Sequence, residues 1–271
     1  MKVALCLIAR LEGKYIQEFI EYYKALGFNK IFIYNNNRGW DNDNIVEEVK
    51  KYVEEDFVSI KDWNYDIGNV QKPAYQHCFN TYRNQYDWIA YFDADEYIVL
   101  PENTTIQDFL SQKKFDDFGG VAIPSINYDD NDLIVNDSKT RLDKYTRPTI
   151  TGRDKAFFKT IVRCKKNNVN FYSLVSDGCH LAYMNNNKIC DANGDIVKWN
   201  DVMCKPNVSE FYNIFLKHIP TGCIDDYIKY KNRRGWPDTH CTKKFGLEFF
   251  EEYNILTQEK IDYYNNRRNK I

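Results

Sequence analysis

The sequence contains no hydrophobic run long enough to cross a membrane as a helix, which takes about 20 apolar residues. The apolar run 3–9 near the N-terminus is short and leads directly into the charged residues Arg10, Glu12 and Lys14. A secretory signal peptide has instead a longer apolar region followed by a cleavage site of small residues. We therefore expect a soluble, cytoplasmic protein.

The chain also lacks an excess of basic residues and any closely spaced pair of cysteines. Its 37 Lys and Arg and 39 Asp and Glu give a formal net charge of −2, whereas a nucleic-acid-binding protein usually shows a clear basic excess. The eight cysteines include no C-x-x-C pair, and Cys6 is one that lies inside an apolar run. This pattern indicates reduced, buried thiols rather than a disulfide framework or a zinc site. We expect no nucleic-acid partner.

A length of 271 residues without repeats or low-complexity segments favours one α/β domain with insertions. The 21 Tyr, 17 Phe and 5 Trp are unusually many. Tyr and Trp present a flat apolar face with one polar atom, which suits stacking on sugar rings and bases. A genome that favours Tyr, Asn, Lys and Ile explains the same composition.

The first hundred residues alternate between strand-like and helix-like patterns. Continuous apolar runs are typical of strands buried on both faces, and apolar residues at helical spacing are typical of amphipathic helices. Repeated β-α-β units predict parallel strands with right-handed crossovers and helices on both faces of the sheet. With the strands of the second half added, we expect a mixed sheet. The predicted strands are 3–8, 30–34, 57–60 and 88–92, and the predicted helices are 15–26, closed by Gly27, 45–53 and 74–82.

The second half is less regular, with a polar segment at 125–154 whose length suggests a functional loop. Thr105 is predicted to cap a helix. The segment 185–200 is rich in Asn, Asp and Gly and predicts an exposed hairpin or insertion. Strands are predicted at 121–123, 157–162, 171–175 and 211–219, and helices at 224–231 and 247–264.

The motif Asp93-Ala94-Asp95 at the end of the fourth predicted strand is the sharpest chemical signal. Two carboxylates beside a buried strand are costly unless they are compensated. A divalent cation compensates them, and hard carboxylate oxygens suit Mg²⁺ or Mn²⁺. A cation with open coordination positions can bridge the two phosphates of a nucleotide-sugar. Arg10 to Glu12 and Asn35 to Asn37 end other strands, where α/β sheets bind ligands, so we expect all three clusters to converge.

The strand followed by Asp-x-Asp-Glu, an aromatic residue and Ile resembles the D-x-D segment of GT-A glycosyltransferases, in particular the family-2-like and family-92-like bacterial group. The helical segment from Tyr15 to Gly27, the strand ending in Asn35-Asn36 and the pair Gln71-Lys72 are similar to that group as well. A later block, from His218 to Tyr227 followed by Arg234-Gly235, resembles the group's His-Tyr-x-x-Lys-Ser-x-x-Glu-Phe segment and its Arg-Gly.

The resemblance departs from the group at Gly222 and Cys223, where the group has Lys and Ser. A phosphate-binding role at this place therefore requires another lysine, and Lys217, Lys229 and Lys231 are the candidates.

The resemblance implies a GT-A fold in which residues 1–100 bind the nucleotide and metal and residues 101–271 bind the acceptor. It implies a hexosyl transfer from a nucleotide-sugar, expected to be a UDP-sugar, with Mn²⁺ or Mg²⁺ as cofactor. The acceptor is expected to be a glycan, a lipid-linked or a protein-linked group. The implied nucleotide pocket is formed by Arg10, Glu12, Asn35, Asn36, Asp66, Lys72 and Asp93.

The third metal ligand is expected to be His218, which joins Asp93 and Asp95 because it ends a late strand as in many GT-A enzymes. His180 is the alternative. Imidazole accompanies carboxylates on Mn²⁺ more readily than on Mg²⁺.

Inverting glycosyl transfer also needs a carboxylate that accepts the acceptor's proton. Asp238 is the preferred candidate, because Trp236 before it can stack on a sugar. Asp177, Asp225 and Asp226 are the other candidates. Basic residues near the middle strand that can neutralise the diphosphate are Arg153, Lys155 and Lys159.

Three other readings account for parts of the pattern. An aspartyl-phosphate phosphatase also has D-x-D after a strand, but with Thr or Val where Tyr97 stands. A sugar nucleotidyltransferase normally has a glycine-rich loop after its first strand, where this chain has only Gly13. A carbohydrate-binding module without activity explains the aromatic residues but not the paired acids. The stretch 248–270 is predicted to pack on its own domain, with a partner or a membrane surface as alternatives, and a homo-oligomer is compatible with the sequence.

Overall fold

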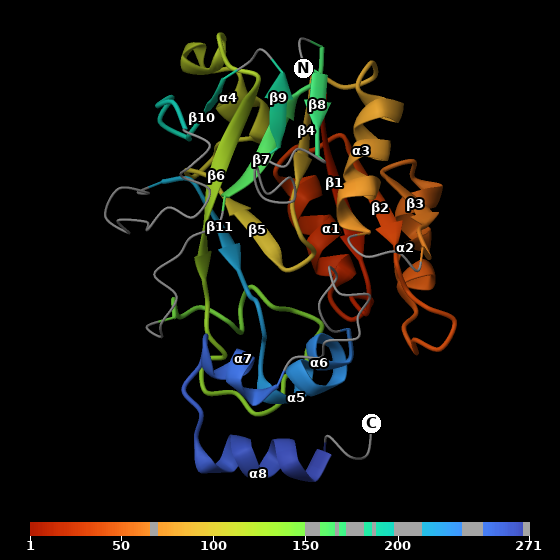
Figure 1. Ribbon diagram of the computed structural model, residues 1–271, viewed down its shortest axis with the longest axis vertical. Helices are drawn as coiled ribbons and strands as arrows, with labels where there is room; N and C mark the ends of the chain where they lie inside the picture. Colours follow the sequence, from red (N-terminus) through yellow and green to blue (C-terminus); the bar gives the residue numbers. More distant parts are fainter. Residues whose placement is uncertain are drawn as a thin grey trace.

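A mixed β-sheet runs through the centre of the computed structural model (Figure 1), in the strand order β3-β2-β1-β4-β7-β6-β11-β5 with β10 paired to β6. The structure describes residues 1–65, 70–149, 158–165, 168–171, 182–185, 188–197, 213–234 and 246–267. The strands are β1 (Val3–Ala9), β2 (Lys30–Asn35), β3 (Val58–Asp62), β4 (Trp88–Tyr91), β5 (Glu96–Val99), β6 (Gly120–Asn127), β7 (Phe158–Arg163), β8 (Asn168–Asn170), β9 (Tyr183–Asn185), β10 (Ile189–Cys190) and β11 (Phe215–His218).

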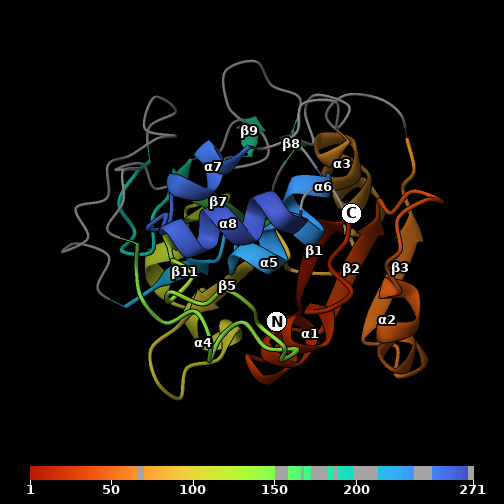
Figure 2. The ribbon, with the colours of Figure 1, turned by 90° about the horizontal axis from the view of Figure 1, so that it is seen from below.

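The helices lie on both faces of this sheet and, late in the chain, beyond one end of its strands (Figure 1). They are α1 (Ile16–Ala25), α2 (Ile45–Glu54), α3 (Gln71–Tyr82), α4 (Ile106–Leu110), a 3-10 turn (Lys113–Phe115), α5 (Ile224–Asp226), a π-helical segment (Tyr227–Lys231), α6 (Asn232–Arg234), α7 (Leu247–Glu251) and α8 (Gln258–Arg267). Figure 2 shows α1 and α2 on one face of the parallel strands and α3 on the other. The predicted α/β architecture, a mixed sheet with helices on both faces, is confirmed.

The first half of the chain forms the parallel part of the sheet, as predicted. β1 pairs in parallel with both β2 and β4, and β2 pairs in parallel with β3. Apolar residues fill both faces of β1: Leu5 packs in the cluster that includes α1, and Cys6 in the cluster that includes α3. Gly27, with φ of +89°, ends the first helix at the expected place. Since β1, β2 and β4 run the same way, their carboxyl ends lie at one edge.

The second half adds antiparallel pairs that place the site. β7 lies antiparallel between β4 and β6. β5 begins at Glu96, directly after the Asp-x-Asp turn, and pairs antiparallel with β11 up to His218. β5 is a strand that the sequence pattern does not predict. This pair of short strands brings His218, distant in sequence, beside the acidic turn. Thr105 caps α4 with a capping box, as expected.

The prediction of one helix over 247–264 is wrong, because α7 ends at Glu251 and α8 starts at Gln258. Between them Asn254 is buried and its side chain bonds the Asp130 backbone N–H at 2.8 Å and the Thr221 hydroxyl at 2.9 Å. These tertiary hydrogen bonds hold the chain in a turn that helical spacing alone does not predict. Of the predicted strand 171–175, only Phe171 lies within the described residues. None of the described helices is both long and apolar enough to span a bilayer.

Helix α8 is fixed to the rest of the molecule by a buried ion pair. Lys260 Nζ lies 2.6 Å from Asp130 Oδ2, and both side chains are almost completely buried. Replacing Lys260 with Met leaves the Asp130 carboxylate without its cation. Breaking a buried pair on one side costs about 3–5 kcal/mol, so we expect a loss of this size in the free energy of unfolding, measured with urea at pH 7.

Burial raises the pKa of Asp130. The unpaired Asp130 carboxylate destabilises the folded state only while it is ionised, and its raised pKa means that it becomes protonated on mild acidification. The loss in the free energy of unfolding caused by Lys260→Met should therefore be smaller at acidic pH than at pH 7. The control is Lys24→Met, which removes an exposed pair with Glu55 and should cost about 1 kcal/mol or less. Equal losses in the two variants contradict the prediction.

Candidate functional site

The polar clusters predicted to converge do meet at the carboxyl ends of the parallel strands. Arg10 follows β1, Asn36 follows β2 and Asp93 follows β4. Arg141, from the loop after β6, joins two of these ends, because its guanidinium donates to Glu12 at 2.9 Å and to the Ala94 carbonyl at 3.1 Å. The site therefore lies where ligands bind in open α/β sheets.

Asn35 and Asn36 use their side chains to connect neighbouring strand ends. Asn35 Nδ2 donates to Asp62 Oδ1 at 3.0 Å, and Asn36 Nδ2 donates to the Trp63 carbonyl at 2.7 Å. Both asparagines are buried. They fix the edge of β2 against β3, which is the place predicted for the nucleotide.

The other residues predicted for the nucleotide pocket have different surroundings. Arg10 pairs with Asp41 at 2.7 Å, which ties the loop after β2 to the end of β1. Lys72 lies in the first turn of α3 and is partly buried. Asp66 lies outside the described residues.

Asp93 is oriented by donors from three side chains. Its Oδ1 accepts hydrogen bonds from Gln71 at 2.7 Å and Tyr75 at 3.3 Å, and its Oδ2 faces the Lys159 ammonium at 2.6 Å. Lys159 also lies 3.6 Å from Glu96, and its side chain is 1% exposed. One fully buried ammonium thus serves two carboxylates. Burial raises the pKa of Glu96 to about 8, against the opposing effect of Lys159.

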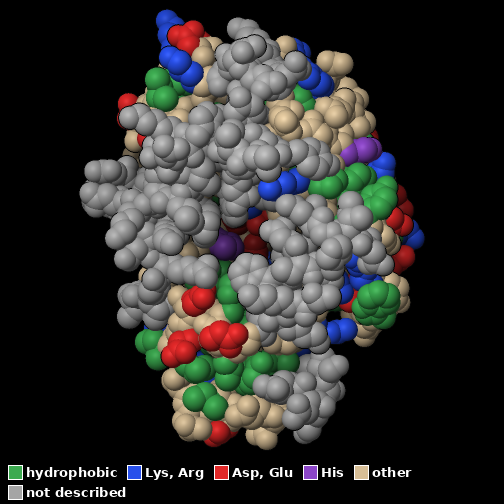
Figure 3. All heavy atoms as spheres, viewed as in Figure 1, with side chains coloured by type: hydrophobic (Ala, Val, Ile, Leu, Met, Phe, Trp, Pro, Cys, Tyr) green, Lys and Arg blue, Asp and Glu red, His purple; other side chains and the backbone are tan. Residues whose placement is uncertain are grey.

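Asp95 lies deeper than Asp93 and has different neighbours at its two oxygens. Oδ2 faces Lys231 Nζ at 3.0 Å, and Oδ1 faces His218 Nε2 at 3.6 Å. Burial by itself raises the pKa of Asp95, but the positive charge of Lys231, with Arg234 and Arg141, outweighs it and holds the pKa well below its usual range. Asp95 is therefore ionised at neutral pH. Figure 3 shows acidic side chains beside a histidine in a recess of this face.

His218 points its Nε2 toward Asp95 Oδ1. Burial lowers the pKa of His218 to about 4, so its ring is neutral at neutral pH. Its Nδ1 lies 2.8 Å from Asn127 Oδ1. In the tautomer with the proton on Nδ1, this contact is a hydrogen bond to the Asn127 carbonyl oxygen and Nε2 carries the lone pair. In that tautomer Nε2 and Asp95 Oδ1 face each other as two ligands of one cation would.

The fit to a divalent cation is therefore good at Asp95 and His218. Within the residues that the structure describes, no group of three or more His, Cys, Asp or Glu side chains is arranged to hold a metal ion. Asp93 belongs to the same turn, but its oxygens face Lys159, Gln71 and Tyr75. The predicted set of Asp93, Asp95 and His218 is thus not assembled as a set of three.

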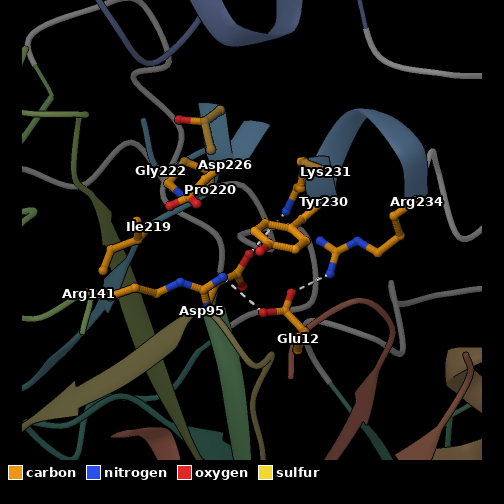
Figure 4. A pocket seen from close by; sticks show the side chains of 11 residues that line it. Glu12, Asp95, Arg141, Ile219, Pro220, Gly222, Asp226, Tyr230, Lys231 and Arg234 are labelled. Carbon is orange, nitrogen blue, oxygen red and sulfur yellow. Dashed lines mark hydrogen bonds and ion pairs between the residues drawn. The ribbon is translucent and has the colours of Figure 1, made fainter. Parts of the chain in front are cut away.

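A cavity next to Asp95 contains three basic side chains that point at acids (Figure 4). Arg234 Nη1 lies 2.6 Å from Glu12, which Arg141 contacts from the other side at 2.9 Å. Glu12 is thus held between two arginines. The lining residues are Glu12, Asp95, Arg141, Ile219, Pro220, Thr221, Gly222, Asp226, Tyr230, Lys231 and Arg234.

Of the three lysines that could replace the missing one at position 222, Lys231 alone lines this cavity. Lys217 donates to the Leu142 carbonyl at 2.8 Å, and Lys229 pairs with Asp225 at 2.5 Å. Gly222 has φ of +66°, which favours glycine over lysine there. The ammonium group in the cavity is therefore that of Lys231, which lies about one turn after Tyr227 in the π-helical segment.

Two of the candidate bases lie in the described residues, and both carboxylates already have donors. Asp226 lines the cavity, accepts from Tyr15 and Tyr145, and pairs with Lys14 at 2.8 Å. These three side chains therefore fix the orientation of the Asp226 carboxylate.

Asp225 faces Lys229 and accepts from the Tyr263 hydroxyl at 2.8 Å. Asp177, Asp238, His180, Arg153 and Lys155 lie outside the described residues.

Sequence reasoning missed Arg141, Gln71 as a partner of Asp93, and Tyr75. Arg141 belongs to the polar segment 125–154, whose length was the only signal of a function there. Its partners Glu12 and Ala94 are distant in sequence, so no local pattern identifies it.

The fold and this cluster define an α/β protein whose site, beyond the strand ends, combines buried carboxylates, a neutral histidine and converging cations. Such a set suits a ligand that carries phosphates together with a metal ion. Residues 3–175 match the model of glycosyltransferase family 92. The chain belongs to this family, and its architecture agrees with the GT-A fold that the resemblance implied.

Two curated relatives are plant proteins of the same family. A glycosyltransferase family 92 protein of Oryza sativa subsp. japonica is 27% identical over 108 residues, covering 40% of this chain and 18% of the relative. A family 92 protein of Arabidopsis thaliana is 30% identical over 104 residues, covering 37% of this chain and 17% of the relative. The matches thus span about a fifth of the length of these relatives.

Two solved structures are distantly similar to this chain. S. aureus TarS 1-349 in complex with UDP has a TM-score of 0.38 and 15% identity, covering 60% of this chain and 47% of that chain. GalNAc-T7 with UDP, GalNAc and Mn²⁺ has a TM-score of 0.37 and 12% identity, covering 60% of this chain and 35% of that chain. Both similarities cover only part of each protein.

Proposed function

We propose that this chain is a metal-dependent glycosyltransferase that transfers a hexose from a nucleotide-sugar, with a UDP-sugar as donor, to a glycan, lipid-linked or protein-linked acceptor. The observation that carries the proposal is the imidazole of His218 facing the Asp95 carboxylate across 3.6 Å, beside a cavity lined by Arg141, Lys231 and Arg234. Membership of family 92 supports the same activity.

In this proposal Asp95 and His218 hold the cation directly, and Asp93 supports it from the same turn. A divalent cation bound there supplies positive charge to the departing diphosphate. Lys231 and Arg234 line the adjacent cavity and can neutralise the remaining phosphate charge.

The other assignments follow the two halves of the chain. Residues 1–100 bind the nucleotide through Arg10, Asn35, Asn36, Asp66 and Lys72, and residues 101–271 bind the acceptor. Glu12 positions the two arginines that it contacts. Asp238 is kept as the proposed base that takes the acceptor's proton.

The test is Mn²⁺-dependent release of UDP from a panel of UDP-hexoses, with and without candidate acceptors. We expect release that requires the metal. A sugar nucleotidyltransferase instead consumes a nucleoside triphosphate, and a carbohydrate-binding protein without activity releases nothing. Either of these results overturns the proposal.

The metal ligands are tested by titrating activity with Mn²⁺ in His218→Ala. Mutating a group that hydrogen-bonds a metal ligand typically weakens metal binding by about 10–100-fold. Losing a ligand itself should therefore raise the half-saturating Mn²⁺ concentration by at least about 10–100-fold. His180→Ala should have the smaller effect. His77→Ala is the structural control, because its ring bonds Tyr34 and Lys61 rather than the site. A larger effect at His180 reverses the assignment.

A further inference from the structure

The helical segment from Tyr227 to Arg234 sends two cations across the cavity to acids on strand ends. Lys231 and Arg234 are three residues apart, so their side chains project from one side of the segment. Lys231 reaches Asp95 at 3.0 Å and Arg234 reaches Glu12 at 2.6 Å, both over more than a hundred residues of sequence (Figure 4). These contacts connect the second half of the chain to the predicted metal site.

Lys231 occupies one side of the carboxylate that the proposed cation needs. Its ammonium faces Asp95 Oδ2 at 3.0 Å, while Oδ1 faces His218 Nε2 at 3.6 Å. A divalent cation between Oδ1 and Nε2 would lie next to this ammonium, and like charges at such distances repel each other strongly in a partly buried site. The lysine and the cation therefore compete for the same carboxylate.

The two lysines of the site differ in their freedom to move. Lys159 is 1% exposed and is shared by Asp93 and Glu96, so its removal would leave two acids without a cation. Lys231 is 17% exposed, forms its ion pair with Asp95 among the acids of the described residues, and lines the cavity. Its flexible four-carbon side chain can turn into the cavity while the backbone of the helical segment stays in place.

We propose that Lys231 is an exchangeable counter-ion, which neutralises Asp95 in the ligand-free protein and moves to a phosphate of the donor when a divalent cation takes its place. The proposal rests on the function proposed above and adds a coupling between cation and donor. The cation displaces Lys231 from Asp95, and the displaced ammonium then contributes to binding the phosphate.

This exchange predicts effects of opposite sign in one variant. Lys231→Met removes the competitor, so Mn²⁺ should bind about tenfold more tightly in the absence of nucleotide, within the usual range of coupling between two sites. The same variant lacks the ammonium for the phosphate, so UDP should bind about tenfold more weakly at saturating Mn²⁺. A lysine with a merely structural role has no reason to change the two affinities in opposite directions.

The experiment is calorimetric titration of the full chain with Mn²⁺ alone, and then with UDP in excess Mn²⁺. Lys229→Met is the matched control, because Lys229 is in the same segment but pairs with Asp225. Lys231→Arg retains the charge and should bind Mn²⁺ no more tightly than the wild type. Circular dichroism confirms that the variants are folded.

The outcomes separate the inference from the function. If wild type binds Mn²⁺ through Asp95, as judged with Asp95→Asn, and Lys231→Met binds it no more tightly, the exchange is wrong and the metal site stands. If neither wild type nor Lys231→Met binds Mn²⁺, with or without UDP, both the metal site and the exchange are wrong. Tighter Mn²⁺ with weaker UDP in Lys231→Met supports the exchange.

Discussion

Asp95→Asn is expected to lower kcat/KM for sugar transfer by at least about 1000-fold, or about 4 kcal/mol at 1.36 kcal/mol per tenfold. Asn keeps the shape of the side chain but removes the charge that faces both His218 and Lys231. Without that charge the proposed cation loses its main ligand, and the departing diphosphate loses its counter-charge. Alanine at both Asp93 and Asp95 should abolish turnover.

The fold should survive this change, because Asp95 lies in a turn and its backbone is held by neighbouring strands. The matched control is Asp87→Asn, an acid before the same strand β4 whose partner is the exposed Lys165. Transfer activity should be unchanged in that variant. Full activity of the double alanine variant, with Mn²⁺ still required, would remove the D-x-D turn from the mechanism.

The parallel half of this fold could be predicted from the sequence because its signals are local. A continuous apolar run such as β1 indicates a strand that is buried on both faces. Gly27 indicates the end of a helix, because glycine readily adopts the positive φ that the chain has there. The direction of parallel strands then places their polar ends together. The convergence of Asp93 with Asn36 and Arg10 therefore follows from local patterns and the topology that they imply.

The contacts within the site could not be predicted in the same way, because they join segments far apart in the sequence. β5 is only four residues long and pairs with β11, more than a hundred residues later, so neither strand has a strong local signal. The break between α7 and α8 depends on hydrogen bonds from Asn254 to the rest of the molecule. The place of Lys231 at Asp95 depends on the path of the whole second half.

The same distinction applies to Asp93 and Glu12, whose tertiary partners their spacing does not predict. Spacing places Asp93 and Asp95 at one strand end, but it does not say which carboxylate other residues already bind. Lys159, from β7, pairs with Asp93, whereas Asp95 faces Lys231 with one oxygen and His218 with the other. A D-x-D motif thus predicts a site, and the tertiary partners decide what each acid does.

The second large effect is expected in Arg141→Met, which should lower the free energy of unfolding by about 3 kcal/mol and transfer activity as well. Arg141 is buried, pairs with Glu12 at 2.9 Å, donates to the Ala94 carbonyl and lies over the Tyr15 ring at 4.1 Å. Met replaces most of the apolar contact but none of the charge. The loop after β6 then loses the contacts that this side chain makes with Glu12 and Ala94. Urea unfolding and the UDP-release assay measure the two effects.

Arg147→Met is the matched control, since this arginine belongs to the same loop and pairs with Asp129 and Asp132. It is considerably more exposed, so its loss should cost about 1 kcal/mol or less. Similar losses in both variants would show that the loop, rather than the buried position of Arg141, is responsible.

A double-mutant cycle with Glu12→Gln separates the ion pair from the other contacts of Arg141. Because Glu12 is held between Arg141 and Arg234, removing its charge weakens both pairs at once. The two substitutions should therefore cost less together than the sum of their separate effects, by an interaction energy of about 1–3 kcal/mol. An additive result would mean that Arg141 acts through Ala94 and Tyr15, and that Glu12 positions Arg234 alone. In that case Glu12→Gln should lower kcat/KM clearly while changing the free energy of unfolding little. The reason is that Arg234 faces the cavity where the diphosphate is proposed to bind.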